Sequence, residues 1–164
     1  NILTFTYSTT YQQQAVKLPI AFELVRKDQW VEKSTKQEGK FITRRVRQAS
    51  VSKIEMLRRR LHTLVFDNQI CFKYVTFDTW YADSELISHI VTRFNKHCVC
   101  ALKANRLLSF DRDVAPKQRA YVSISEADLE PDVAYRVYLK GIALEVLVVK
   151  RVFRHPDGRT SVQY

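Results

Sequence analysis

Apolar and polar positions alternate at the start of the chain. In residues 2–7 the alternation has the two-residue period of a half-buried strand. Residues 16–26 predict a second strand, with Pro19 near its start or on a sheet edge, and the polar residues 8–14 predict the turn between them. Between residues 27 and 48 charges dominate and apolar residues are scattered, so we expect a long, mobile, basic loop there.

A helix signal follows this basic segment. Ser52 and Glu55 have the spacing of a capping box, in which the serine oxygen accepts a backbone N–H and the glutamate reaches back to the serine. Apolar residues then recur at helical spacing and predict a helix over 52–66. These residues are Ile54, Leu57, Leu61, Leu64 and Val65.

The next segment predicts a strand, a helix and a second strand. Residues 70–77 have the pattern of a buried strand that ends at Asp78, and residues 98–102 predict another short apolar strand. Between them, an apolar stripe predicts a helix over 84–95, with Asp83 at its N-cap or in its first turn. Such a β-α-β unit has parallel strands. Asp78 is therefore expected at the rim of a parallel sheet.

Beyond Lys103 the chain predicts short strands separated by turns. The run His155–Gly158 contains Pro-Asp-Gly and predicts a hairpin. We therefore expect an α/β part over 1–103 and a β-rich part over 104–164. The strand candidates are 106–110, 120–124, 134–139, 143–153 and 161–164.

The position of Asp78 also has a chemical meaning. The carboxyl ends of parallel strands form the crevice where open α/β sheets bind ligands. A carboxylate there is a hard oxygen ligand, suited to Mg²⁺ or Mn²⁺. The competing interpretation is that Asp78 only begins a turn or a helix.

The net charge of the chain predicts the class of its partner. The chain has 27 Lys and Arg against 17 Asp and Glu, and so a net charge of +10, which attracts polyanions such as nucleic acid. Arg44, Arg45 and Arg47 are candidates for a DNA-binding track, although such a run is also typical of a solvated surface.

Two other classes of site and segment are not expected. Cys71, Cys98 and Cys100 lie in apolar segments and predict buried, reduced thiols of an intracellular protein. We predict no zinc site, because the Cys-x-Cys pair lies within a strand and lacks a second ligand pair. We also predict no membrane span, since no apolar run reaches the roughly 18 residues required, and no signal peptide.

Residues 72–108 resemble the second-aspartate region of insertion-sequence DDE transposases, which have an RNase H-like core. The resemblance rests on a hydrophobic strand that ends in Asp78, the Trp80-Tyr81 pair, a helix, a strand, and Leu-Lys-x-Asn-Arg at 102–106. Weaker likeness extends over the rest of the chain. The 2–7 and 16–26 strands resemble the second and third core strands, and 104–164 resembles the family's β-strand insertion.

The resemblance implies a function and a set of site residues. It implies an α/β fold, an incomplete RNase H-like mixed sheet with flanking helices, followed by the β-rich insertion. Asp78 would be a catalytic, metal-binding acid, and the intact protein would use two Mg²⁺ (or Mn²⁺) ions to cleave and join double-stranded DNA at transposon ends. Lys103, Arg106, Trp80 and Tyr81 would contact DNA. The alternatives are that Trp80 and Tyr81 pack the turn over the sheet edge and that Lys103 and Arg106 are a solvated charge pair. The family also implies a homodimer associated with the nucleoid in the bacterial cytoplasm.

The sequence departs from the family at the other two acids. The first Asp would precede residue 1 and the last Glu would follow the insertion; neither Glu23 nor Glu145, both in predicted strands, matches these positions. We therefore expect an internal fragment without transposase activity of its own. Two alternatives stay open: a non-catalytic DNA-binding remnant of a transposase, and another nuclease with an RNase H fold.

Overall fold

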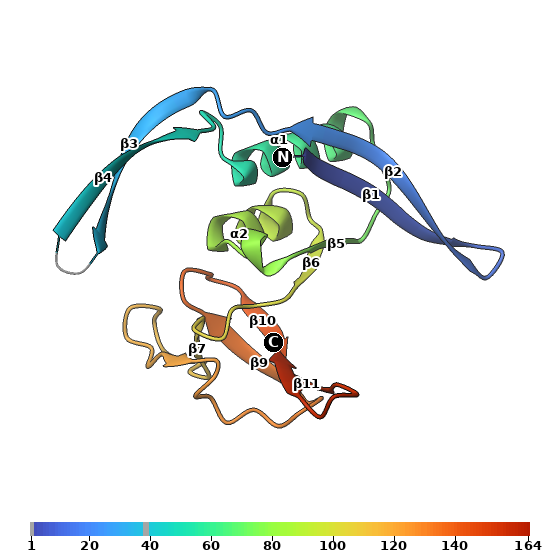
Figure 1. Ribbon diagram of the computed structural model, residues 1–164. Helices are drawn as coiled ribbons and strands as arrows, with labels where there is room; N and C mark the ends of the chain where they lie inside the picture. The colour runs from blue at the N-terminus through green and yellow to red at the C-terminus, as the bar shows by residue number, and fades with distance from the viewer. Residues whose placement is uncertain (1, 38–39) are drawn as a thin grey trace. The chain divides into compact units, whose positions relative to one another are not determined.

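The computed structural model describes residues 2–37 and 40–164, which form two compact units (Figure 1). The first unit ends at Asp67 and the second begins at Asn68. The first unit contains two β-hairpins and a helix, and the second contains a β-α-β unit and a small antiparallel sheet.

The first hairpin pairs β1 (Ile2–Tyr11) with β2 (Gln14–Leu24). β1 continues four residues beyond its prediction, whereas β2 begins and ends two residues earlier than predicted. Its turn consists of Gln12 and Gln13, with φ values of 46° and 64°. Two successive positive φ values match the twist of a two-residue hairpin turn. The polar residues predicted as a turn therefore mostly belong to the strands, because two residues suffice to reverse the chain.

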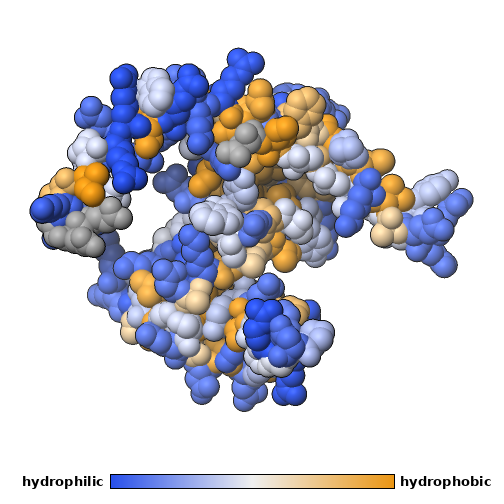
Figure 2. Space-filling model, viewed as in Figure 1, coloured by the Kyte–Doolittle hydropathy of each residue, from blue (hydrophilic) through white to orange (hydrophobic). Residues whose placement is uncertain are grey.

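Pro19 produces an irregularity in this hairpin. Phe5 pairs with Ala21 and Thr6 with Pro19, so the register shifts at Ile20. Proline lacks the N–H that a ladder needs, which confines it to edges and bulges. The hairpin also leaves large apolar side chains exposed, including Phe22 at 71 % exposure, and Figure 2 shows hydrophobic residues gathered over it.

The second hairpin corrects the prediction of a mobile loop over 27–48. β3 (Gln29–Gln37) and β4 (Lys40–Gln48) form an unbroken antiparallel ladder. In residues 29–36 and 40–48 the side chains are exposed on both faces, apart from the half-buried pair Val31 and Val46. A ribbon with solvent on both sides needs no alternation of apolar residues, so the pattern gave no strand signal.

Helix α1 (Lys53–His62) continues into one π-helical turn, η1 (Thr63–Asp67), and the prediction of a helix over 52–66 is confirmed. The Ser52 side chain accepts a hydrogen bond from the Glu55 backbone N–H at 3.1 Å, as predicted. The Glu55 carboxylate does not complete the box; it accepts from Arg59 Nε at 2.8 Å, a helical i,i+4 pair.

The second unit begins with the expected β-α-β arrangement. β5 (Tyr74–Phe77) and β6 (His97–Cys100) pair in parallel and are joined through α2 (Ser84–Thr92). The strands are shorter than predicted. Asp83 is the N-cap of α2, and its carboxylate accepts from the backbone N–H groups of Glu85 and Leu86, both at 3.0 Å.

The β-rich part forms one four-stranded antiparallel sheet and one hairpin. The sheet has the order β10-β9-β7-β8, and its strands are β7 (Leu107–Ser109), β8 (Val122–Ser123), β9 (Ala134–Leu139) and β10 (Glu145–Val149). The strand predicted over 143–153 is divided at Lys150. Beyond it, β11 (Arg151–Arg154) changes partner and pairs with β12 (Thr160–Gln163) across the predicted Pro-Asp-Gly turn.

The core of the second unit crosses the division expected at Lys103. Ile87 of α2 packs in one cluster with Leu108 of β7, Val137 of β9 and Val148 of β10. Phe77 and Cys98 pack against the same cluster. The β-rich part is thus no separate packing unit; that 104–164 is an insertion in the family's fold stays a prediction.

Each unit has its own small sheets, and the single mixed sheet implied by the family resemblance stays a prediction. In residues 2–37 and 40–164, the β1–β2 ladder and the β5–β6 ladder are separate two-stranded sheets. The observed architecture is mixed α/β with small sheets. Within the described residues no helix is long and apolar enough to span a membrane.

Candidate functional site around Asp78

Asp78 lies where the sequence predicts it, directly after the carboxyl end of β5. Its backbone is extended, with φ −74° and ψ 161°, and it precedes the short 3₁₀ helix η2 (Thr79–Tyr81). The Tyr81 N–H donates to the Asp78 carbonyl at 2.9 Å, which closes this turn. The Asp78 side chain is exposed. A carboxylate held at a strand end and open to solvent can accept a ligand without rearrangement of the backbone.

Two neighbouring side chains, Thr79 and Tyr81, interact with the Asp78 carboxylate. Thr79 Oγ1 donates a hydrogen bond to Asp78 Oδ1 at 2.9 Å. The pKa of Tyr81 is raised above its usual value, first by burial and second by the negative charge of Asp78. The Tyr81 phenol therefore stays neutral and lies within electrostatic reach of Asp78.

The structure brings two other predicted residues together. Lys103 Nζ lies 5.3 Å from the centroid of the Trp80 ring, a cation–π contact across two segments of the chain. Trp80 is 77 % exposed, so its ring does not pack the turn onto the sheet. Two residues after Asp78, an exposed indole therefore contacts an ammonium group, a composition suited to a nucleic-acid strand.

Arg106 has a structural role that the sequence did not indicate. Its guanidinium group donates to Ser84 Oγ, at the start of α2, and to the Lys140 carbonyl at 3.3 Å. The side chain is half-buried. Arg106 thus connects the start of α2 with the β9–β10 turn. A contact with DNA by the same residue stays a prediction.

Gly141 allows this connection. Its φ is +85°, and a Cβ at this position would lie 2.9 Å from Ser84 Oγ. Gly158 has a similar φ of +81° but open space around it. We predict that Gly158→Ala costs about 1–2 kcal/mol from the left-handed backbone alone, and that Gly141→Ala lowers the melting temperature further because Ser84 must move. Equal melting temperatures in the two variants would contradict the close approach.

The arginines predicted to contact DNA lie in the first unit. Arg44, Arg45 and Arg47 are exposed residues of β4. The guanidinium carbons of Arg45 and Arg47 each lie 5.3 Å from the ring centroid of Trp30. Trp30 was not predicted as a functional residue; an aromatic residue within a basic segment is the signal that indicates it.

The acids of the described residues do not complete a metal centre. In the part of the chain that the structure describes, no three His, Cys, Asp or Glu side chains are placed to hold a metal ion. Asp83 is engaged as a helix cap. Glu23 accepts from Arg60 Nε at 2.8 Å, and Glu145 pairs with Arg112 at 3.4 Å and with Arg136 at 3.3 Å. Asp78 is therefore one candidate ligand, and these residues alone do not fit a two-metal site.

The cysteines differ in their surroundings. Cys98 and Cys100 are half-buried on β6, whereas Cys71 is exposed, contrary to the prediction. Burial raises the pKa of the Cys98 thiol, and burial together with Cys98 raises the pKa of Cys100 to about 11. Both thiols of β6 are protonated at neutral pH, so neither is an activated nucleophile.

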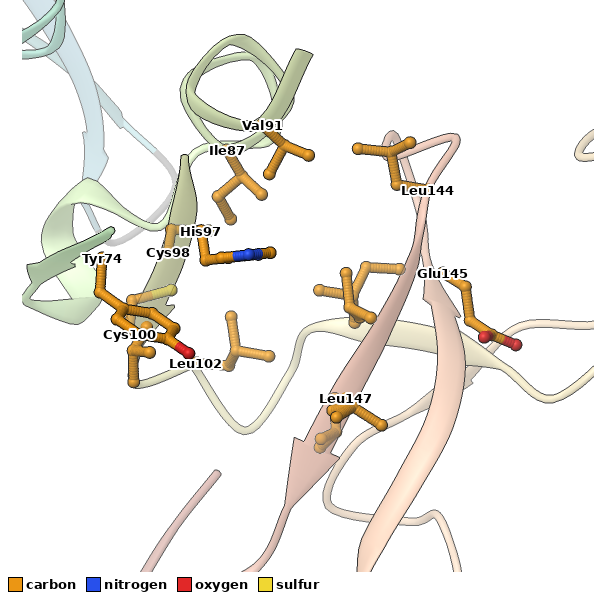
Figure 3. Close-up of a pocket in the computed structure, with 14 residues that line it drawn as sticks. Tyr74, Ile87, Val91, His97, Cys98, Cys100, Leu102, Leu144, Glu145 and Leu147 are labelled. Atoms are coloured by element: carbon orange, nitrogen blue, oxygen red, sulfur yellow. The ribbon is translucent and has the colours of Figure 1, made fainter. Parts of the chain in front are cut away.

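A cleft of about 610 Å³ lies elsewhere in the second unit. Figure 3 shows Ile87 and Val91 of α2 on one side and Leu144 and Leu147 on the other. Most of its lining is apolar, and Asp78 does not line it. The cleft carries no converging set of polar groups, so we do not assign it a ligand.

The family comparison agrees with this geometry. Residues 4–123, well over half of the chain, match the family described as DDE superfamily endonuclease. The matched residues include Asp78, Trp80, Lys103 and Arg106. Comparison with curated proteins and with solved structures gave no match. A strand-end aspartate in a parallel β-α-β unit, found within a match of this length, leads to one conclusion: the chain belongs to the DDE superfamily of endonucleases.

Proposed function

We propose that this chain is the central part of the catalytic core of a cut-and-paste DNA transposase, and that Asp78 is one of its metal-binding acids. The observation that carries the proposal is the exposed Asp78 carboxylate at the carboxyl end of β5, within the residues that match the family. Membership of the family implies an RNase H-like fold and a nuclease or transposase-like function.

DDE superfamily endonucleases generally use divalent metal ions, which supply charge stabilisation at the phosphodiester. In this proposal Asp78 contributes one oxygen ligand to Mg²⁺ or Mn²⁺. Thr79 restrains the rotation of that carboxylate through its 2.9 Å hydrogen bond. The family's first Asp and last Glu have no counterpart at Glu23 or Glu145, whose carboxylates are held by arginines. In this proposal the intact protein supplies these two acids from other segments.

The surroundings of Asp78 support DNA as the substrate. Trp80 presents an exposed ring and Lys103 a positive charge, which together provide stacking and phosphate attraction. The chain's net charge of +10 favours the same partner. The substrate in this proposal is double-stranded DNA at transposon ends, cleaved and joined by a homodimer of the intact protein.

Metal-dependent plasmid cleavage tests the proposal. The product of the complete gene is incubated with supercoiled plasmid carrying the element's ends, with Mg²⁺ or Mn²⁺ and separately with EDTA. We expect nicked and linear DNA with either metal, none with EDTA, and none from the 164-residue chain alone. Cleavage in EDTA would contradict the assignment of Asp78 as a metal ligand.

A second function is favoured by one observation: in the described ranges no three His, Cys, Asp or Glu side chains are placed together to hold a metal ion. This function is DNA binding without cleavage, by a remnant of a transposase. It predicts that the product of the complete gene binds DNA, that metal does not induce cleavage, and that binding is unchanged when Asp78 is replaced.

A further inference from the structure

The β3–β4 hairpin, residues 29–37 and 40–48, is the most positively charged exposed element of the first unit. Residues 29–48 contain six Lys and Arg against two Glu. β4 itself contains Lys40, Arg44, Arg45 and Arg47 and no acid. Within the described residues none of these three arginines forms an ion pair. Their charge is therefore available to a partner.

The two faces of the hairpin differ. The register places Trp30 opposite Arg47 and Glu32 opposite Arg45, so these four residues share one face. The other face carries Val31 and Val46, followed by Lys33 and Arg44. Val31 and Val46 are the half-buried residues of the hairpin, and both lie on this second face. The Trp30 face is therefore the one that is fully open to solvent near the base of the hairpin.

The Trp30 face is also ordered before any partner binds. Trp30 is 54 % exposed, and the guanidinium carbons of Arg45 and Arg47 each lie 5.3 Å from its ring centroid. A ring that already holds two cations restricts their rotation, which lowers the entropy lost on binding. Glu32 is the one acid on this face in the described strands, and Lys36 offsets its charge.

The base of the hairpin is fixed. The Ser50 hydroxyl donates to Asp28 Oδ2 at 2.6 Å, and the Ser50 N–H donates to Asp28 Oδ1 at 2.7 Å. These bonds join the segment before β3 to the segment after β4. The hairpin thus leaves the unit as a defined ribbon, with nine residues per strand, or about 30 Å at roughly 3.3 Å per residue.

We propose that this hairpin is a DNA-binding arm that lies in the major groove of a duplex, with the Trp30 face toward the DNA. The major groove, about 12 Å wide, admits a two-stranded β-ribbon, and arginine is the side chain best suited to both phosphates and guanine edges. The inference rests on the proposal that the chain binds double-stranded DNA. It adds a second contact surface, on a different unit from Asp78.

Two matched double variants of the 164-residue chain test the arm. Arg45→Ala with Arg47→Ala removes two charges from the Trp30 face, and Lys33→Ala with Lys40→Ala removes two from the opposite face. Binding to a labelled duplex is measured by fluorescence anisotropy over a range of salt concentrations. We expect the first variant to raise Kd about tenfold or more and to flatten the salt dependence by about two counterions. The second should change Kd less than about threefold.

Each outcome has a distinct meaning. Equal losses in the two variants, or a larger loss on the Lys33 face, overturn the orientation. Unchanged affinity in both, with the chain still binding duplex, overturns the arm but not DNA binding. A chain that binds no duplex overturns the proposed DNA binding as well, and tighter binding to double-stranded RNA overturns major-groove recognition, since the RNA groove is deep and narrow.

The fluorescence of Trp30 provides an independent measurement. The chain has two tryptophans, so a Trp80→Phe variant reports Trp30 alone. Addition of duplex should quench or shift the Trp30 emission, and the Arg45/Arg47 double variant should need correspondingly more DNA. Emission that does not change at saturating duplex would overturn the placement of this face against DNA.

Discussion

Replacing Asp78 by Asn in the product of the complete gene, the proposed transposase, is expected to lower its DNA-cleavage rate at least about a hundredfold. Asparagine keeps the shape of the side chain and can still accept from Thr79 Oγ1, which lies 2.9 Å from Asp78 Oδ1. It loses the negative charge that a divalent ion requires. Metal-assisted charge stabilisation contributes several kcal/mol, and each 1.36 kcal/mol changes a rate tenfold.

Asp83→Asn is the matched control for this experiment. It removes the same charge five residues away, and asparagine caps a helix about as well as aspartate does. The two hydrogen bonds that Asp83 accepts from Glu85 and Leu86 are therefore kept. Cleavage of plasmid by both variants is compared at equal DNA binding. Wild-type cleavage by Asp78→Asn, or an equal loss in both variants, would contradict the role of Asp78.

Leu108→Ala is expected to destabilise the second unit by about 3–5 kcal/mol. Leu108 is 0 % exposed, pairs with both Val122 and Leu139, and lies in the main core cluster. Removing its side chain leaves a cavity that a sheet interior fills only in part. Since small domains are stable by about 5–15 kcal/mol, the loss is a large share of the total.

Leu147→Ala makes the same chemical change at a site that is 67 % exposed, on β10 of the same sheet. It should change stability by less than about 0.5 kcal/mol. Hydrogen exchange of the β9 amides measures the second unit without a contribution from the first. Similar protection in the two leucine variants would contradict the placement of the core around β7.

The β3–β4 hairpin is an element in which the structure differs clearly from the prediction. The charged segment predicted a loop because most of its residues are polar and its few apolar residues do not alternate regularly with them. The hairpin is held by cross-strand pairs such as Val31 with Val46 and by the 2.8 Å contact between the Ser34 and Thr43 hydroxyls. Such pairs join residues on different strands, and the order of residues along the chain does not show which of them will pair.

The residues around Asp78 show the same difference between local features, which the sequence predicts, and contacts between distant segments, which it does not. The strand that ends at Asp78 and the cap at Asp83 were predicted, since both depend on neighbours within a few residues. The contact of Lys103 with Trp80 and the bonds of Arg106 with Ser84 and Lys140 depend on how distant segments fold together. The family resemblance implied a DNA contact for both cations, and the structure shows that Arg106 connects the start of α2 to the β9–β10 turn.

The sequence by itself determined the local features of this protein. Helix caps, the parallel β-α-β unit, the Pro-Asp-Gly turn and the position of Asp78 follow from hydrogen bonds and side-chain periodicity over short stretches. The tertiary structure decided which strands pair, that the core joins Ile87 to Leu108 across the expected boundary, and which cations stay exposed. The physical reason is that burial and strand pairing depend on contacts between segments that are distant in the sequence. No single segment specifies those contacts.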